Sequence, residues 1–269
     1  VQLDAIPTPR AAFKQYVAAV VFADKPWSTD HGQARAAHRT ANLIDRVTRG
    51  VVVTPAAPDA LLLIATGCAH CQQVLVAMGD LVKQGRIGRL EVVNIAVSPL
   101  PASALEVRSV PWVRIGPFEL AGAQTASELR GWAERAEDPA ALVTYLTTQL
   151  ESGELTSTIA ACRRHGVLLT TLLSMLGDLE TPFAVRIGGT AVVEDLAGDG
   201  NWLDDALARE ALFALADSPH PQVRADAAHL IGLVEEDDAM ALLQRLAEDD
   251  DPSVQEIATE SLAGRTTAE

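Results

Sequence analysis

The most constraining feature of the sequence is a pair of cysteines, Cys68 and Cys71, placed between an apolar run and an amphipathic segment. The apolar run, Ala60–Ala65, is typical of a buried strand, and Ala69–Lys83 has helical periodicity. We therefore predict a strand, a turn and a helix whose first turn carries both sulfur atoms. A thiolate at that position is stabilised by the helix dipole and by unpaired backbone N–H groups, which lower its pKa. A Cys-x-x-Cys motif at a strand-to-helix junction indicates redox chemistry.

The segments after the cysteine pair have the pattern of further strands and a closing helix. Leu90–Val97 and Val107–Ile115 are β-like runs, and Phe118–Ala121 is a short apolar run that ends at a glycine. A proline removes a hydrogen-bond donor from a sheet, so Pro111 is compatible with a strand only near its start. Ala126–Ala136 carries apolar residues at helical spacing. A small α/β domain is therefore expected.

The order and spacing of these features resemble the thioredoxin superfamily. Cys68-Ala69-His70-Cys71 opens the predicted helix, and Val110-Pro111 follows where the family places its cis-proline. Gly122–Leu129 is similar to the glycine turn that enters the family's last helix. The resemblance covers residues 51–137 and implies a thioredoxin-like fold.

The resemblance also implies thiol–disulfide exchange with a protein substrate and no organic cofactor. Cys68, at the end of the motif nearest solvent, would attack the substrate, and Cys71 would resolve the mixed disulfide. His70 would stabilise the Cys68 thiolate electrostatically and so raise the reduction potential.

The same resemblance assigns the residues that meet the substrate. Pro111 would expose the backbone of Val110 for pairing with a substrate strand. Gly67 and Ala69, which flank Cys68, are expected to border the same substrate. The alternative for Pro111 is a purely structural cis-proline.

Three positions depart from the family's usual pattern. Leu62 stands where the family usually has a buried acidic residue that handles the proton of the resolving thiol. Gly67 replaces the usual tryptophan, and His70 replaces the proline of the commonest motif. The Cys-x-His-Cys motif, with valine before the cis-proline, is more similar to the disulfide-oxidase branch than to the reductases.

A zinc site is the rival interpretation of Cys68, His70 and Cys71. Structural zinc takes four ligands, usually from two separated pairs. The only other cysteine, Cys162, lies far along the chain with His165 three residues after it. A shared site would require the two halves of the chain to meet, so we expect no metal and interpret Cys162 as a buried apolar residue.

The C-terminal half contains an internal repeat with a period of 31 residues. Leu215–Ala227 aligns with Leu246–Ala258, and leucine, alanine, acid, proline and valine recur in register. A proline is preorganised for the first turn of a helix, so each repeat is predicted to be a helix pair. The pattern resembles HEAT repeats and implies an all-α solenoid. The predicted helices of the two repeats are Asp204–Ala216, Pro221–Leu233, Asp238–Ala247 and Pro252–Leu262.

Helices upstream are expected to extend this stack. They are predicted at Pro139–Leu150, Leu155–Arg164 and Val167–Leu176, with glycines such as Gly188-Gly189 interrupting the helical pattern. Pro182–Arg186 is similar to a degenerate earlier copy of the repeat start.

Charge divides the chain at the same place. Residues 1–137 contain 14 Lys and Arg against 12 Asp and Glu, whereas residues 138–269 contain 7 Arg, no Lys and 24 acidic residues. The acidic part would repel phosphate backbones, so nucleic acid is not an expected partner. No apolar stretch approaches the roughly 20 residues of a membrane span. The expected partner is a protein bound by the helical repeats.

We therefore predict three segments: a helical segment at 1–50, a thioredoxin-like domain at 51–137 and an acidic HEAT-like domain at 138–269. The first segment would cap the second or form a homodimer contact. The chain begins at Val1 and no leader is recognised, which favours the cytoplasm, or the periplasm if a leader was removed. The function predicted is protein thiol–disulfide exchange. The alternative is a binding adaptor whose cysteine pair is a redox switch or vestigial.

Overall fold

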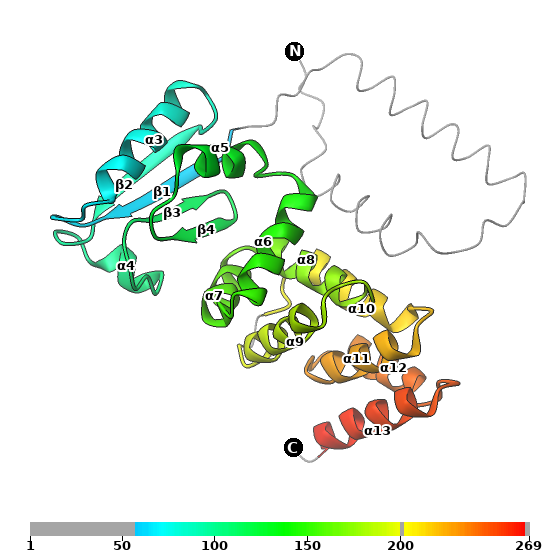
Figure 1. Cartoon of the computed structure of the whole chain (residues 1–269). Coiled ribbons are helices and arrows are strands. Elements are labelled where there is room, and N and C mark those ends of the chain that lie inside the picture. Colours follow the sequence, from blue (N-terminus) through cyan, green and yellow to red (C-terminus); the bar gives the residue numbers. More distant parts are fainter. Residues whose placement is uncertain (1–56, 200–201, 267–269) are drawn as a thin grey trace, which may run out of the picture.

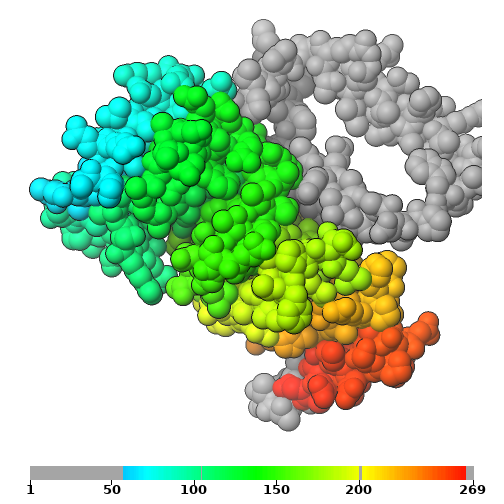
Figure 2. Space-filling model, viewed as in Figure 1, coloured from blue at the N-terminus to red at the C-terminus, as the bar shows by residue number. Residues whose placement is uncertain are grey.

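The computed structural model describes residues 57–199 and 202–266. The helices predicted within residues 1–50 lie outside the described residues. A small sheet with its helices stands at one end of the described chain, and a succession of helices leads away from it to the C-terminus (Figure 1). The space-filling view shows the same elongated shape, with the sheet and the last helix at opposite ends (Figure 2).

The sheet has four strands in the order β2-β1-β3-β4. β1 pairs parallel with β2 and antiparallel with β3, and β3 pairs antiparallel with β4. Leu62, at the centre of β1, has Val92 and Val113 as its cross-strand partners. The strands are β1 (Asp59–Ile64), β2 (Arg89–Asn94), β3 (Trp112–Ile115) and β4 (Phe118–Ala121).

Helices cover both faces of this sheet, which explains the continuous apolar run of β1. Leu62 belongs to the core formed with α3 (Cys71–Lys83) and α5 (Ala126–Glu134). Leu61 and Leu63 point to the other face, where they pack with Trp112 and α4 (Leu100–Ala104). The sequence pattern did not predict α4. The expected α/β arrangement of this part is thus confirmed in its coarse form, a small mixed sheet with helices.

Two predicted strands are longer than the observed ones. The second ends at Asn94 because its side chain accepts a hydrogen bond from the N–H of Ala96, and the N–H of Ser98 bonds to its carbonyl. The third begins only at Trp112, since Pro111 has no N–H to donate to a sheet.

The helices after the sheet pack mainly against helices one or two positions away along the chain, as in a stack of repeats. Pro139, Pro221 and Pro252 each begin a helix, as predicted. The side chain of Asp138 accepts the N–H of Ala140 and caps the first of them. The helices are α6 (Pro139–Glu151), α7 (Leu155–Arg164), α8 (Gly166–Leu176), α9 (Phe183–Ala197), α10 (Ala206–Ala214), α11 (Pro221–Gly232), α12 (Asp237–Leu246) and α13 (Pro252–Thr266).

The prediction that Gly188-Gly189 interrupts the helical pattern is wrong. Both glycines lie inside α9, and each stands where a neighbouring helix approaches closely. A Cβ atom at Gly188 would lie 3.1 Å from Leu150, and one at Gly189 would lie 3.0 Å from Leu172. These glycines therefore serve helix packing rather than helix termination.

The sheet and the helices that follow it share one apolar core. Phe118 of β4, Trp132 of α5 and Tyr145 of α6 form an aromatic cluster with ring centroids 4.7–6.0 Å apart. The Tyr145 hydroxyl donates to the carbonyl of Glu119 at 3.1 Å. The helical stack is thus packed directly against the edge strand of the sheet.

Candidate functional site

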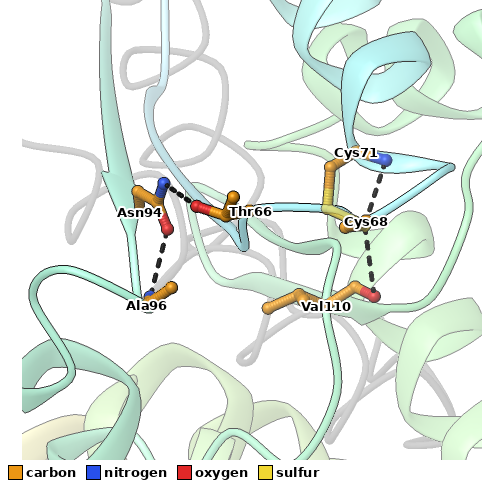
Figure 3. The surroundings of a disulfide bond; sticks show 6 residues. All are labelled: Thr66, Cys68, Cys71, Asn94, Ala96 and Val110. Atoms are coloured by element: carbon orange, nitrogen blue, oxygen red, sulfur yellow. Dashed lines mark hydrogen bonds between the residues drawn. A yellow bond between two sulfur atoms is a disulfide. The ribbon is translucent and has the colours of Figure 1, made fainter.

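Cys68 and Cys71 are joined by a disulfide at the N-terminal end of α3, with a sulfur–sulfur distance of 2.13 Å (Figure 3). The helix begins at Cys71, so only the second sulfur lies in its first turn, and Cys68 lies in the preceding turn. The expectation that both sulfurs lie on the helix is corrected accordingly. Cys68 is partly exposed, whereas Cys71 is 4% exposed. Cys68 is therefore the sulfur that a partner can reach.

The helix N-terminus points one donor at the exposed sulfur. The N–H of Cys71 lies 3.2 Å from Cys68 Sγ and donates to it. A first-turn N–H that has no partner within its helix favours a negative charge on the sulfur. In the reduced protein this contact would stabilise a Cys68 thiolate relative to the thiol.

The turn that carries Cys68 is held by the ends of β1 and β2. Gly67 has φ of +81°, a left-handed conformation that favours glycine. The Asn94 side chain donates to Thr66 Oγ1 at 3.0 Å (Figure 3). The Cys68 N–H donates to the Ala65 carbonyl at 3.2 Å. Sequence reasoning missed Asn94, which lay inside the predicted run Leu90–Val97 and ends the observed strand β2.

A second loop faces the disulfide. The Val110–Pro111 peptide bond is cis, and the Val110 carbonyl oxygen lies 3.9 Å from Cys68 Sγ (Figure 3). Within residues 57–199 and 202–266, the backbone N–H groups of Ser109 and Val110 make no hydrogen bond. A strand of another chain can therefore pair with this loop beside the reactive sulfur.

The remaining predicted site residues stand around the motif. Ala69 and His70 are exposed, and His70 is the residue that precedes α3, without a side-chain capping bond. Leu62 is 0% exposed and packs in the core on the α3 side of β1. The position therefore lies inside the apolar core and carries no acid.

Cys162 and His165 lie at the junction with the helical stack rather than beside Cys68. Cys162 is buried on α7, and burial together with the charge of Glu119 raises the pKa of its thiol to about 12. His165 Nε2 lies 3.4 Å from Glu119 Oε1. In the described part of the chain, no three His, Cys, Asp or Glu side chains are grouped to hold a metal ion.

Glu119 is a buried charge that sequence reasoning missed, although an acid inside the run Phe118–Ala121 was a usable signal. It is 7% exposed, and Arg164 of α7 forms two hydrogen bonds with it, at 2.8 and 2.6 Å. Burial opposes ionisation, but His165 and Arg164 outweigh burial and hold the pKa of Glu119 below its ordinary value. This ion pair joins the sheet to the helices at neutral pH.

A groove of about 570 Å³ lies between the sheet and the first helices of the stack. One side is the segment Leu105–Ser109, which leads into Val110, and the other side is the start of α7. Its floor includes aromatic residues of β3, α5 and α6. The groove therefore adjoins the loop that faces the disulfide.

The comparisons concern the second half of the chain. A family model described as HEAT repeats matches residues 191–269, which include α10 to α13. This match confirms the predicted HEAT-like repeats, a type of repeat whose extended surfaces bind proteins. No curated protein matches the chain. In residues 57–199 and 202–266, every helix is too short or too polar to cross a membrane.

Proposed function

We propose that residues 51–137 form a thioredoxin-like domain that exchanges thiols and disulfides with protein substrates, and that the acidic helical repeats of residues 138–269 hold the partner. The observation that carries the proposal is the setting of Cys68. Cys68 is partly exposed, and its sulfur accepts an N–H from the start of α3 and faces a loop with unpaired backbone groups. These are the features that a nucleophilic thiol and its substrate require.

The chemistry proceeds in two displacements. The Cys68 thiolate attacks one sulfur of a substrate disulfide, forming a mixed disulfide and releasing the other substrate sulfur as a thiolate. Cys71 loses its proton and attacks Cys68 Sγ, which forms the Cys68–Cys71 disulfide and releases the second substrate thiolate. The substrate gains two electrons and two protons, and the protein loses the same. The reverse sequence oxidises a substrate dithiol.

The neighbouring residues have distinct parts in this scheme. Val110 offers backbone groups for pairing, and Pro111 holds the carbonyl of Val110 toward Cys68, while Gly67 and Ala69 border the substrate. His70 favours the thiolate through its charge and so raises the reduction potential. Leu62 takes the place of the family's usual acid, so Cys71 should lose its proton slowly, and mixed disulfides on Cys68 should persist.

The second candidate function is an adaptor in which the disulfide switches partner affinity. Two observations favour it: the match to HEAT repeats, and the buried leucine at position 62 in place of the family's usual acid. Without that acid, resolution by Cys71 is expected to be slow. A switch needs only one redox change for each binding event, whereas an enzyme must cycle.

Repeated turnover separates the two candidates. The full-length protein is mixed with excess peptide disulfide and glutathione as reductant, and the product is followed over many equivalents. We expect multiple turnovers, loss of turnover in Cys68→Ser, and accumulation of a mixed disulfide in Cys71→Ser. Cys162→Ser is the matched control and should retain turnover, since that thiol is buried. A single equivalent of product would favour the adaptor, and turnover in Cys68→Ser would refute the assignment.

A further inference from the structure

We infer that the groove between the sheet and the first helices binds an extended, positively charged segment of the protein substrate, adjacent to the cysteine that enters the mixed disulfide. The inference rests on the proposed function and adds a substrate class to it. Three properties of the groove support it: its connection to Cys68, its floor and its charge.

The connection runs through one continuous loop. Leu105–Ser109 forms a side of the groove, and the next residue, Val110, has its carbonyl oxygen 3.9 Å from Cys68 Sγ. A substrate bonded to Cys68 and paired with one of the free N–H groups of Ser109 and Val110 follows this loop in an extended conformation. Its neighbouring residues therefore reach the groove.

The floor of the groove is mainly apolar. Trp112 and Leu120 come from the sheet, Trp132 comes from α5 and Tyr145 from α6. Trp112, Leu120 and Tyr145 are buried by packing around them, so the floor is formed before a ligand binds. Its volume of about 570 Å³ falls within the range of about 300–1,000 Å³ usual for ligand sites. It can hold alternate side chains of an extended segment.

The negative charge of the groove favours a positively charged substrate segment. Glu119 and Arg164 line it but neutralise each other. The exposed carboxylates of Glu106, Glu128 and Glu154 remain, against Arg108 alone. The helical stack beyond α7 adds a larger negative charge. A segment with Lys or Arg between apolar residues complements this surface, and an acidic segment is repelled.

Two peptides of equal length test the inference on the reduced full-length protein. Each carries one cysteine in a disulfide with a fluorescent reporter thiol, followed by a tail of alternating Lys and Val or of alternating Gln and Val. Attack by Cys68 releases the reporter. We expect kcat/KM to be about fivefold higher for the Lys tail at low salt, and the ratio to approach one at high salt, because the contacts are exposed and screened.

Matched variants test whether the preference for the Lys-tailed peptide arises in the groove. Glu106→Gln with Glu154→Gln removes two groove charges and should bring the ratio close to one. Glu256→Gln with Glu260→Gln removes two exposed charges on α13 and should leave the ratio unchanged. Equal reduction in both variants would mean that the general field of the stack attracts the peptide, and would overturn the inference.

The outcomes separate this inference from the function beneath it. Equal rates for both tails in the unmodified protein would overturn the groove and leave thiol exchange standing. Failure of both peptides to release the reporter would overturn both. A direct check uses Cys71→Ser with the Lys-tailed peptide trapped on Cys68: hydrogen exchange should slow at residues 105–109 and at the start of α7. Protection confined to α10–α13 would contradict the proposed site.

Discussion

Removing the guanidinium of Arg164 tests how the sheet is attached to the helical stack. In Arg164→Met the Glu119 carboxylate, which is 7% exposed, loses its two shortest hydrogen bonds. Breaking a buried ion pair by removing one partner costs about 3–5 kcal/mol. The Arg164 side chain is 22% exposed and His165 remains 3.4 Å from the carboxylate, so we expect the lower end, about 3 kcal/mol at pH 7.

The loss of stability in Arg164→Met should depend on pH. In the unmodified protein the pKa of Glu119 is lowered, so its contribution to stability is full above the unfolded value of about 4.3 and is lost as the pH falls through the folded value. In Arg164→Met burial is opposed by His165 alone, so the pKa of Glu119 should rise relative to the unmodified protein. The variant then gains stability relative to the unmodified protein as the pH falls from 7 toward 4.

The assay is urea unfolding at pH 7 and pH 4.5, followed by far-UV circular dichroism and tryptophan fluorescence. Arg163→Met is the matched control, because Arg163 is 44% exposed and its pairs with Asp195 and Asp199 lie at the surface. Such surface pairs contribute about 0–1 kcal/mol. A buried, stabilising Glu119–Arg164 pair is refuted if Arg164→Met costs no more stability than Arg163→Met, or if the difference from the unmodified protein does not shrink at pH 4.5.

Three further predictions concern single positions. In the reduced protein, iodoacetamide at pH 7 should label Cys68 first and Cys162 only after unfolding, because burial raises the pKa of Cys162 to about 12. Early labelling of Cys162 would contradict the packing of α7. His70→Pro should lower the reduction potential by about 30 mV. A charge-assisted contact is worth about 1.5–3 kcal/mol, and the exposure of His70 reduces this to roughly 1.4 kcal/mol, which corresponds to about 30 mV. An unchanged potential against glutathione would remove His70 from the mechanism. Gly232→Ala should lower the free energy of unfolding by about 1–3 kcal/mol, because its Cβ would lie 2.8 Å from Cβ of Ser261 on α13. Adding Ser261→Gly should recover part of the loss. Equal stability of Gly232→Ala and the unmodified protein would show that α11 and α13 separate freely.

The local features of this protein were predictable because each depends on a few neighbouring residues. The strand Phe118–Ala121 and the helix Leu155–Arg164 have the predicted bounds, since apolar spacing and short polar breaks define them. Prolines fixed the starts of three helices because they have no N–H to lose there. The turn at Gly67 and the cysteine spacing predicted that both sulfurs lie at the junction of a strand and a helix. The helix itself begins at Cys71, two residues later than expected.

Features that depend on distant pairs were decided only by the tertiary structure. Glycines in α9 looked like breaks because the sequence does not show that Leu150 and Leu172 approach them. The partner of Glu119 lies 45 residues away, and nothing local identifies Arg164 as that partner. The groove exists only because the helices pack against β4 and leave space beside the loop before Pro111. Sequence periodicity specifies which face of a helix or strand is apolar. Which other element that face packs against depends on the packing of the whole chain.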